Sequence, residues 1–244
     1  MNITTRPFEY KDGKQKCIGY MAWDETYADP KPCVLVNHAW GGLDSFAQDK
    51  AIQMAAMGYV GIALDNYGDG VVPETVEEKS AFMGPLKEDR SALLKRLKAG
   101  YRAAAKMDEV DETHMAVMGF CFGGLCSLDM ARAGMKLKAA ISFHGLLDAP
   151  EDHSPKKIKS KVLIAHGWDD PMVPPEHVMA VGQELTASKC DWQLNTYGQT
   201  AHSFMVPEAN NKDMGTIYNS DSERRAWTAT TDLLNEVFGQ HGIS

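Results

Sequence analysis

The sequence lacks the features that are typical of secreted proteins, membrane-spanning proteins and proteins with a structural metal site. Its five cysteines are an odd, scattered set with no C-x-x-C pair and no zinc-like spacing to histidine, so neither a disulfide framework nor a zinc site is predicted. No run approaches the roughly 18 apolar residues of a spanning helix, and residues 1–7 lack the apolar core of a signal peptide. We therefore expect a reduced, cytoplasmic protein with no membrane partner.

Positive charge is also scarce. Acidic residues outnumber basic ones by 33 to 25, which gives a formal net charge of −8. Nucleic-acid binding requires clustered Lys and Arg that neutralise phosphates, so no nucleic-acid partner is expected. The one dense basic stretch, residues 156–161, precedes an apolar run. It fits either a solvated loop or an anion site.

The sequence does contain an alternation of short apolar runs with longer helical patterns, which is typical of βαβ units on a parallel sheet. A β-hairpin is predicted first, from Phe8–Tyr10 and Cys17–Trp23 around a turn. Residues 65–90 are expected as a surface excursion beside a functional site. With 244 residues and no repeat or linker, we expect one domain, residues 1–244. Further strands are predicted at 33–37, 59–64, 115–118, 139–143, 162–165 and 192–197, and helices at 47–57, 90–105, 125–133, 176–187 and 222–238.

Cys121 lies between glycines where a predicted strand turns sharply into a helix. Small residues are needed at such an elbow because the two backbones approach closely. The helix start offers free N–H groups and a positive dipole end, which favour a thiolate. The pattern G-x-C-x-G differs from the hydrolase motif G-x-S-x-G only in its nucleophile. A buried core cysteine is the alternative interpretation.

Two further strand-end loops carry an acid and a histidine. Asp169 and Asp170 follow the apolar strand that ends at Ala165, and His202 follows the last predicted strand. Taken singly, helix-capping aspartates and a surface histidine are the alternatives. The chain order nucleophile, acid, histidine is that of α/β-hydrolase triads. Three such signals together predict an α/β-hydrolase fold, with a mostly parallel sheet flanked by helices.

The segment Asn37-His38-Ala39-Trp40-Gly41-Gly42 follows the first predicted parallel strand. In such hydrolases this loop provides one backbone N–H of an oxyanion hole, and the residue after the nucleophile provides the other. Trp40 and Phe122 are therefore the predicted donors. A tight turn with a buried His38 is the alternative interpretation, and it is compatible with such a hole.

Over nearly its whole length the chain resembles the dienelactone hydrolase family. The matching motifs are Gly-Phe-Cys-Phe-Gly-Gly at 119–124, Gly167-x-x-Asp170-Pro-x-Val173-Pro174, and Ala201-His202-x-Phe204. The resemblance implies that Cys121 is the nucleophile, Asp170 the acid and His202 the base. It implies an enzyme that cleaves a small ester, thioester or lactone and needs neither a metal nor an organic cofactor.

Two positions depart from the best-known members of that family. Ala39 stands where they have a glutamate, and Val206 where they have a substrate-binding arginine. Both departures favour a substrate other than dienelactone. Arg90 is a remaining candidate for an anion contact, with an ordinary helix-face arginine as the alternative. An apolar acyl pocket is predicted from residues that would otherwise pack under their own loops: Tyr67, Phe82, Met83, Met205 and Tyr218.

A second hypothesis is a redox-responsive or ligand-binding protein that uses Cys121 as a reactive thiol on a hydrolase fold. The missing glutamate fits a repurposed site. The acid and histidine favour the enzyme, because a sensor needs no group that activates water. The sequence leaves the oligomeric state and the identity of the substrate open.

Overall fold

The computed structural model describes residues 1–151 and 156–239. The chain divides into two compact units, Met1–Val117 and Met118–Gly239, and strand β5 (Val110–Phe120) runs from the first into the second. The expectation of one domain over residues 1–244 stays a prediction, and its last five residues, 240–244, lie outside the described residues.

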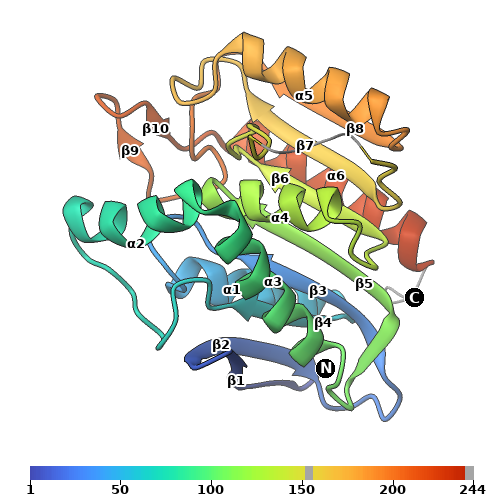
Figure 1. Ribbon diagram of the computed structural model, residues 1–244. Coiled ribbons are helices and arrows are strands. Elements are labelled where there is room, and N and C mark those ends of the chain that lie inside the picture. Colours follow the sequence, from blue (N-terminus) through green and yellow to red (C-terminus); the bar gives the residue numbers. More distant parts are fainter. Residues whose placement is uncertain (152–155, 240–244) are drawn as a thin grey trace. The chain divides into compact units, whose positions relative to one another are not determined.

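The first unit begins with the antiparallel hairpin that the sequence predicts. Strands β1 (Ile3–Asp12) and β2 (Gln15–Asp24) pair along their whole length. β2 pairs antiparallel with β4, and β4 pairs parallel with β3. The strand order is β1-β2-β4-β3-β5 (Figure 1). The remaining elements of this unit are β3 (Lys31–Asn37), α1 (Ser45–Ala56), β4 (Val60–Leu64), α2 (Val76–Glu88) and α3 (Arg90–Ala104).

The second unit continues from the end of β5 in the order β5-β6-β7-β8. β7 pairs parallel with both of its neighbours, β6 and β8. Every strand and helix predicted in this part is present, which makes the sheet mostly parallel with helices between its strands, as expected. The elements are α4 (Phe122–Arg132), β6 (Ala139–Phe143), β7 (Lys161–Gly167), α5 (Pro175–Ala187), β8 (Trp192–Tyr197), the short pair β9 (Asn210–Asn211) and β10 (Thr216–Ile217), and α6 (Ser220–Phe238).

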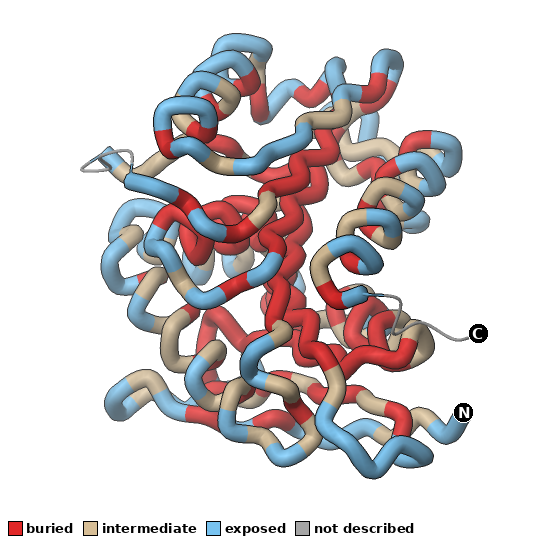
Figure 2. Tube along the Cα trace, turned by 90° about the vertical axis from the view of Figure 1, so that its right-hand side faces the viewer, coloured by how far each residue is buried: buried red, intermediate tan, exposed pale blue. Residues whose placement is uncertain are grey.

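Burial follows the sequence pattern of each strand. Every residue of β4 and β6 is buried, as expected for strands that are continuous apolar runs. In β1 the buried side chains of Phe8 and Tyr10 alternate with exposed neighbours, because one face of a hairpin meets water. Figure 2 shows buried strands as continuous red runs and helices that alternate between buried and exposed positions.

Residues 65–90, expected as a surface excursion, contain a helix that the sequence analysis did not predict, α2. Thr75 Oγ1 accepts a hydrogen bond from the Glu78 N–H at 3.1 Å, and the Glu78 carboxylate accepts one from the Thr75 N–H at 3.2 Å. This capping box is a helix-start signal. None of the residues of α2 is buried, so the helix has no apolar face whose periodicity would predict it.

Candidate active site

Cys121 lies at the junction of β5 and α4 in a backbone conformation that side-chain-bearing residues rarely adopt. Its φ is 54° and its ψ is −116°, and its N–H donates to the Phe143 carbonyl at 3.1 Å. Such strain costs on the order of 1–3 kcal/mol and persists only where neighbouring structure holds it. The strained elbow places a half-buried thiol at the N-terminus of α4.

Two glycines allow this elbow to close. A Cβ atom on Gly119 would lie 1.9 Å from the Gly123 carbonyl oxygen. A Cβ atom on Gly124 would lie 2.5 Å from Ser142 Oγ and 2.7 Å from the Gly145 Cα atom. Side chains cannot approach backbone so closely, so the requirement for small residues at the elbow is steric.

Asp170 and His202 are joined by a short hydrogen bond. His202 Nδ1 lies 2.6 Å from Asp170 Oδ2, and both side chains are buried. The other carboxylate oxygen accepts from the Met172 N–H at 2.8 Å. The backbone of His202 is held on both sides, because its N–H donates to the Gly215 carbonyl and its carbonyl accepts from the Ile217 N–H, each at 2.9 Å. The ring is therefore oriented with Nδ1 toward the acid, which leaves Nε2 for proton transfer.

The ionised forms of Cys121 and His202 stabilise each other. Burial raises the pKa of the Cys121 thiol, but the charge of the nearby His202 ring and the Phe122 N–H lower it, and the net pKa lies below its usual value. Burial lowers the pKa of His202, but Cys121 and Asp170 raise it, and the net pKa lies above its usual value. Both shifts favour a thiolate beside an imidazolium, and the thiolate is the nucleophilic form of cysteine.

His144, which the sequence interpretation did not single out, lies against His202. The two ring centroids are 5.1 Å apart in an edge-to-face arrangement, and Phe204 contacts His144 in the same way at 5.4 Å. Within the described residues, neither ring nitrogen of His144 has a hydrogen-bond partner. Burial lowers its pKa well below the usual value, and His202 lowers it further. Its position directly after β6 is the sequence signal that would have found it, because functional side chains gather at the carboxyl ends of parallel strands.

The two predicted oxyanion-hole donors lie in different units. Phe122 is the first residue of α4, and its N–H interacts with the Cys121 thiol. In the first unit the Trp40 N–H donates to no group of the described residues. Tyr67, predicted to line an acyl pocket, is buried, and its hydroxyl donates to the Trp40 carbonyl at 2.8 Å.

The other predicted pocket residues have different environments. Met83 is half-exposed on α2, and Arg90 is half-exposed as the first residue of α3. Met205, in the second unit, is fully buried. An acyl pocket built from these residues stays a prediction.

One pocket of the second unit borders the loops that carry Asp170 and His202. Its volume is about 440 Å³. None of the three predicted catalytic side chains lines it. The residues that line the pocket are Asp169, Pro171, Gln199, Ala201, Lys212, Asp213, Gly215, Ile217, Tyr218 and Asn219.

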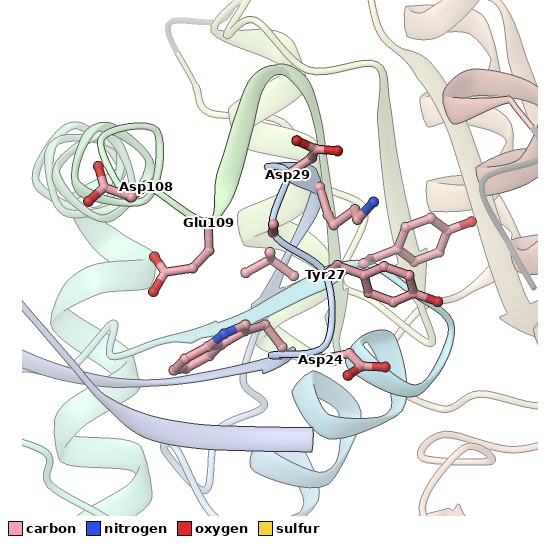
Figure 3. A pocket seen from close by; sticks show the side chains of 11 residues that line it. Asp24, Tyr27, Asp29, Asp108 and Glu109 are labelled. Atoms are coloured by element: carbon pink, nitrogen blue, oxygen red, sulfur yellow. The ribbon is translucent and has the colours of Figure 1, made fainter. Parts of the chain in front are cut away.

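A pocket of about 180 Å³ in the first unit lies at the amino ends of β3 and β4. Figure 3 shows acidic side chains around it together with an aromatic ring, from Asp24, Tyr27, Asp29, Asp108 and Glu109. Cations of the chain itself already partner part of this group: Lys31 Nζ lies 4.5 Å from the Tyr27 ring centroid, and Arg6 pairs with Glu109 at 2.8 Å. The pocket lies at the strand ends opposite to those that carry His38 and Asp65.

Two further findings concern metals and membranes. Across residues 1–151 and 156–239, no group of three or more His, Cys, Asp or Glu side chains is arranged to hold a metal ion. Among the helices of this part of the chain, none combines the length and the apolar composition that crossing a membrane requires.

Comparison with known proteins identifies the family. The chain matches the model of the dienelactone hydrolase family over residues 18–238. A dienelactone hydrolase-like promiscuous phosphotriesterase from metagenomic libraries is 37% identical, with a TM-score of 0.93 and coverage of 98% of this chain and 100% of that chain. An uncharacterized protein of Caenorhabditis elegans is 37% identical over 155 residues, which are 62% of this chain and 98% of that protein.

A more distant structure supports the fold. MGS-M1, an alpha/beta hydrolase from a deep-sea metagenome library, is 14% identical with a TM-score of 0.64, and the comparison covers 96% of this chain and 98% of that chain. At this identity the likeness shows the fold alone. The predicted fold class and family are confirmed: the chain has an α/β-hydrolase fold and belongs to the dienelactone hydrolase family of ester and lactone hydrolases.

Proposed function

We propose that the protein cleaves a small ester, thioester or lactone through an acyl-thioenzyme formed on Cys121. The observation that carries this proposal is the arrangement of the second unit, where a thiol with a lowered pKa interacts with a histidine that is bonded to a buried carboxylate at 2.6 Å. A nucleophile, a base and a group that orients the base are the parts that covalent catalysis requires.

In the first half of the proposed reaction, His202 takes the thiol proton while Asp170 holds its ring. The Cys121 thiolate attacks the carbonyl carbon, and the electron pair of the C=O bond moves onto oxygen. The N–H groups of Phe122 and Trp40 stabilise this oxyanion. His202 then gives its proton to the leaving oxygen or sulfur, and the tetrahedral intermediate collapses to the thioester.

In the second half, His202 removes a proton from water, and the resulting hydroxide attacks the thioester carbonyl. The same two N–H groups stabilise the second oxyanion. The carbon–sulfur bond breaks, the carboxylic acid leaves, and Cys121 returns to its resting state. Losing one donor from such a hole typically costs about 2.7–4 kcal/mol of transition-state stabilisation.

Hydrolysis of p-nitrophenyl acetate by wild type, Cys121→Ala and Cys190→Ala tests the proposal. Cys190 is the matched control because it is also a half-buried free thiol. We expect Cys121→Ala to lose turnover while its circular dichroism spectrum stays unchanged, and Cys190→Ala to retain turnover. In the wild-type protein, mass spectrometry should find an acetyl group on Cys121. Wild-type turnover in Cys121→Ala would rule the proposal out.

The thiol-sensor hypothesis makes a different prediction for the same protein. Mild peroxide would then oxidise Cys121 reversibly while ester turnover stayed at background. The bond between Asp170 and His202 favours the enzyme, because a sensor needs a thiolate and has no use for an oriented water-activating base. The five free thiols support a reducing, cytoplasmic setting for either activity.

A phosphotriester is a second candidate substrate class. The metagenomic relative described above is named a promiscuous phosphotriesterase, and it is 37% identical with complete coverage of its own chain. The proposed chemistry extends to it: the thiolate attacks phosphorus, the phosphorus–oxygen bond to the leaving group breaks, and the leaving oxygen takes the proton of His202. Water activated by His202 then cleaves the sulfur–phosphorus bond, and the same two N–H groups stabilise the phosphoryl oxygen in both steps. A diethyl p-nitrophenyl phosphate assay with wild type and Cys121→Ala tests this: Cys121-dependent release of nitrophenol supports it, and background release counts against it.

A further inference from the structure

Strands β3 and β4 end side by side, because Asn37 lies opposite Leu64 in their parallel register. Asn66, in the loop after β4, joins the two strand ends. Its backbone N–H donates to His38 Nε2 at 3.1 Å, and its side-chain amide donates to Asn37 Oδ1 at 3.1 Å. The buried His38 ring is thereby fixed between the two loops.

The tautomer of His38 follows from these partners. A backbone N–H only donates, so Nε2, which receives the Asn66 N–H, carries no proton. A neutral imidazole then carries its proton on Nδ1. Nδ1 lies 2.6 Å from the Ala39 carbonyl oxygen and therefore donates to it. Burial lowers the pKa of His38, which keeps the ring neutral and both hydrogen bonds intact near pH 7.

The bond from His38 determines the direction of the next N–H group. In a trans peptide the C=O and N–H groups point in opposite directions, so the Ala39 carbonyl held toward His38 turns the Trp40 N–H away from it. The Gly42 N–H also donates to the Ala39 carbonyl, at 3.2 Å. The next carbonyl, that of Trp40, is held by the Tyr67 hydroxyl at 2.8 Å. Two successive peptide planes are thus fixed.

The loop that holds His38 is itself braced. The buried Asp65 carboxylate accepts four backbone N–H groups at 2.7–3.2 Å, from Ile18, Tyr67, Gly68 and Gly70. Arg96 donates to the carbonyls of Asn66 and Tyr67 at 3.1 and 3.0 Å. The Tyr67 ring meets the His38 ring edge to face at 4.7 Å. A donor held by such a network is oriented before substrate binds, which is the condition for strong oxyanion stabilisation.

We propose that His38 is a positioning residue of the oxyanion hole: its Nδ1–H holds the Ala39 carbonyl and so aims the Trp40 N–H at the substrate oxygen. This inference rests on the proposed function, in which that N–H stabilises the tetrahedral intermediate. It adds a residue that acts through the backbone of the loop after β3 and is not itself an oxyanion donor. The Tyr67 hydroxyl holds the carbonyl of the following peptide, that of Trp40, in the same way.

The test compares His38→Phe with His38→Asn. Phenylalanine keeps a ring against Tyr67 but removes the donor, whereas the Asn side-chain amide places a donor near the position of Nδ1. We expect His38→Phe to lower kcat for p-nitrophenyl acetate on the order of 10²-fold with little change in KM, since the hole acts mainly on the transition state. His38→Asn should recover most of that loss. His177→Phe, an exposed histidine on α5, is the control and should match wild type.

Alkylation of Cys121 by iodoacetamide separates positioning from misfolding. This displacement forms no oxyanion, so His38→Phe should alkylate at the wild-type rate. A parallel loss of alkylation and hydrolysis would mean that the substitution disturbs the fold around Cys121, and it would overturn the inference. A kcat of His38→Phe equal to that of wild type would overturn it as well.

Two outcomes distinguish this inference from the proposed function. If wild type shows no Cys121-dependent hydrolysis, the proposed function fails. If wild type hydrolyses the ester and His38→Phe is equally active, only the inference fails. Nitrogen-15 chemical shifts of His38 give a readout that needs no activity: the Nδ1–H tautomer is expected, and the Nε2–H tautomer would overturn the inference in either case.

Discussion

His202 Nδ1 and Asp170 Oδ2 lie 2.6 Å apart although the two residues follow different strands. β7 and β8 are parallel neighbours in which Gly167 lies opposite Tyr197. The loops after them are joined by backbone hydrogen bonds, from the Trp168 N–H to the Tyr197 carbonyl and from the Asp169 N–H to the Thr200 carbonyl, both at 2.9 Å. The pairing of β7 with β8 and the hydrogen bonds between the loops that follow them therefore position Asp170 and His202.

Replacing Asp170 by Asn is expected to lower kcat for an activated ester by at least about 10²-fold. An amide can donate to Nδ1 and so favours the wrong tautomer of His202. Steady-state hydrolysis at pH 7.5 measures the effect. Asp169→Asn is the matched control, because Asp169 is the exposed neighbour of the buried Asp170. A larger loss in the control would contradict the assignment of Asp170.

Cys121 is expected to react with iodoacetamide at a lower pH than an ordinary thiol. Its pKa is lowered and that of His202 is raised. The thiolate forms as the pH rises through the Cys121 pKa, and the imidazolium is lost only as the pH rises through the His202 pKa. The alkylation rate should thus reach half its maximum below about pH 8.5, the value for a free thiol.

The second half-buried thiol serves as the internal reference for this titration. Burial, together with Asp191 and Glu184, raises the pKa of Cys190 to about 11, so Cys190 should stay unmodified near pH 7. His202→Gln should move the Cys121 midpoint upward. An unchanged midpoint in that variant would mean that His202 does not stabilise the thiolate.

Because His144 is buried, the free energy of unfolding is expected to fall as the pH drops below about 6.5. Its pKa in the native state is far below the value of about 6.5 in an unfolded chain. Below pH 6.5 the unfolded chain therefore binds a proton that native His144 does not, and the free energy of unfolding falls as the pH drops. The slope from one such group reaches about 1.36 kcal/mol per pH unit.

Urea unfolding between pH 7 and pH 5 measures this contribution. His144→Phe keeps an aromatic ring against His202 and removes the titrating group, so its stability should fall less steeply than that of wild type. His177→Phe, exposed on α5, should fall as wild type does. Equal slopes for all three proteins would show that His144 titrates normally in the native state.

Gly119→Ala is expected to destabilise the fold by more than about 2 kcal/mol, at the upper end of the cost of overpacking. The new methyl group would lie 1.9 Å from the Gly123 carbonyl oxygen, so strand or helix must move. Gly198→Ala is the control: nothing lies within 4 Å of its Cβ position, and a change within about 0.5 kcal/mol is expected. Urea midpoints compare the two, and equal midpoints would contradict a steric role for Gly119.

The parts of the fold that follow from local patterns were predictable. Strand β6 at Ala139–Phe143 and strand β8 at Trp192–Tyr197 have the predicted bounds, because apolar runs and turn residues are visible in neighbouring positions. Helix α2 was not predicted, because the helix that follows the start signal at Thr75 has no buried apolar face that would show as a periodic pattern. The family was predictable from three motifs, whose chain order is itself a property of the sequence.

Residue spacing and chain order were sufficient to predict the fold class, the family and a short set of candidate residues. Three relations became visible only in the folded chain: Asp170 Oδ2 lies 2.6 Å from His202 Nδ1, His144 packs on the same ring, and His38 holds the Ala39 carbonyl. These relations join different loops. They depend on strand register and on how each loop docks, and packing sets both after the local elements have formed.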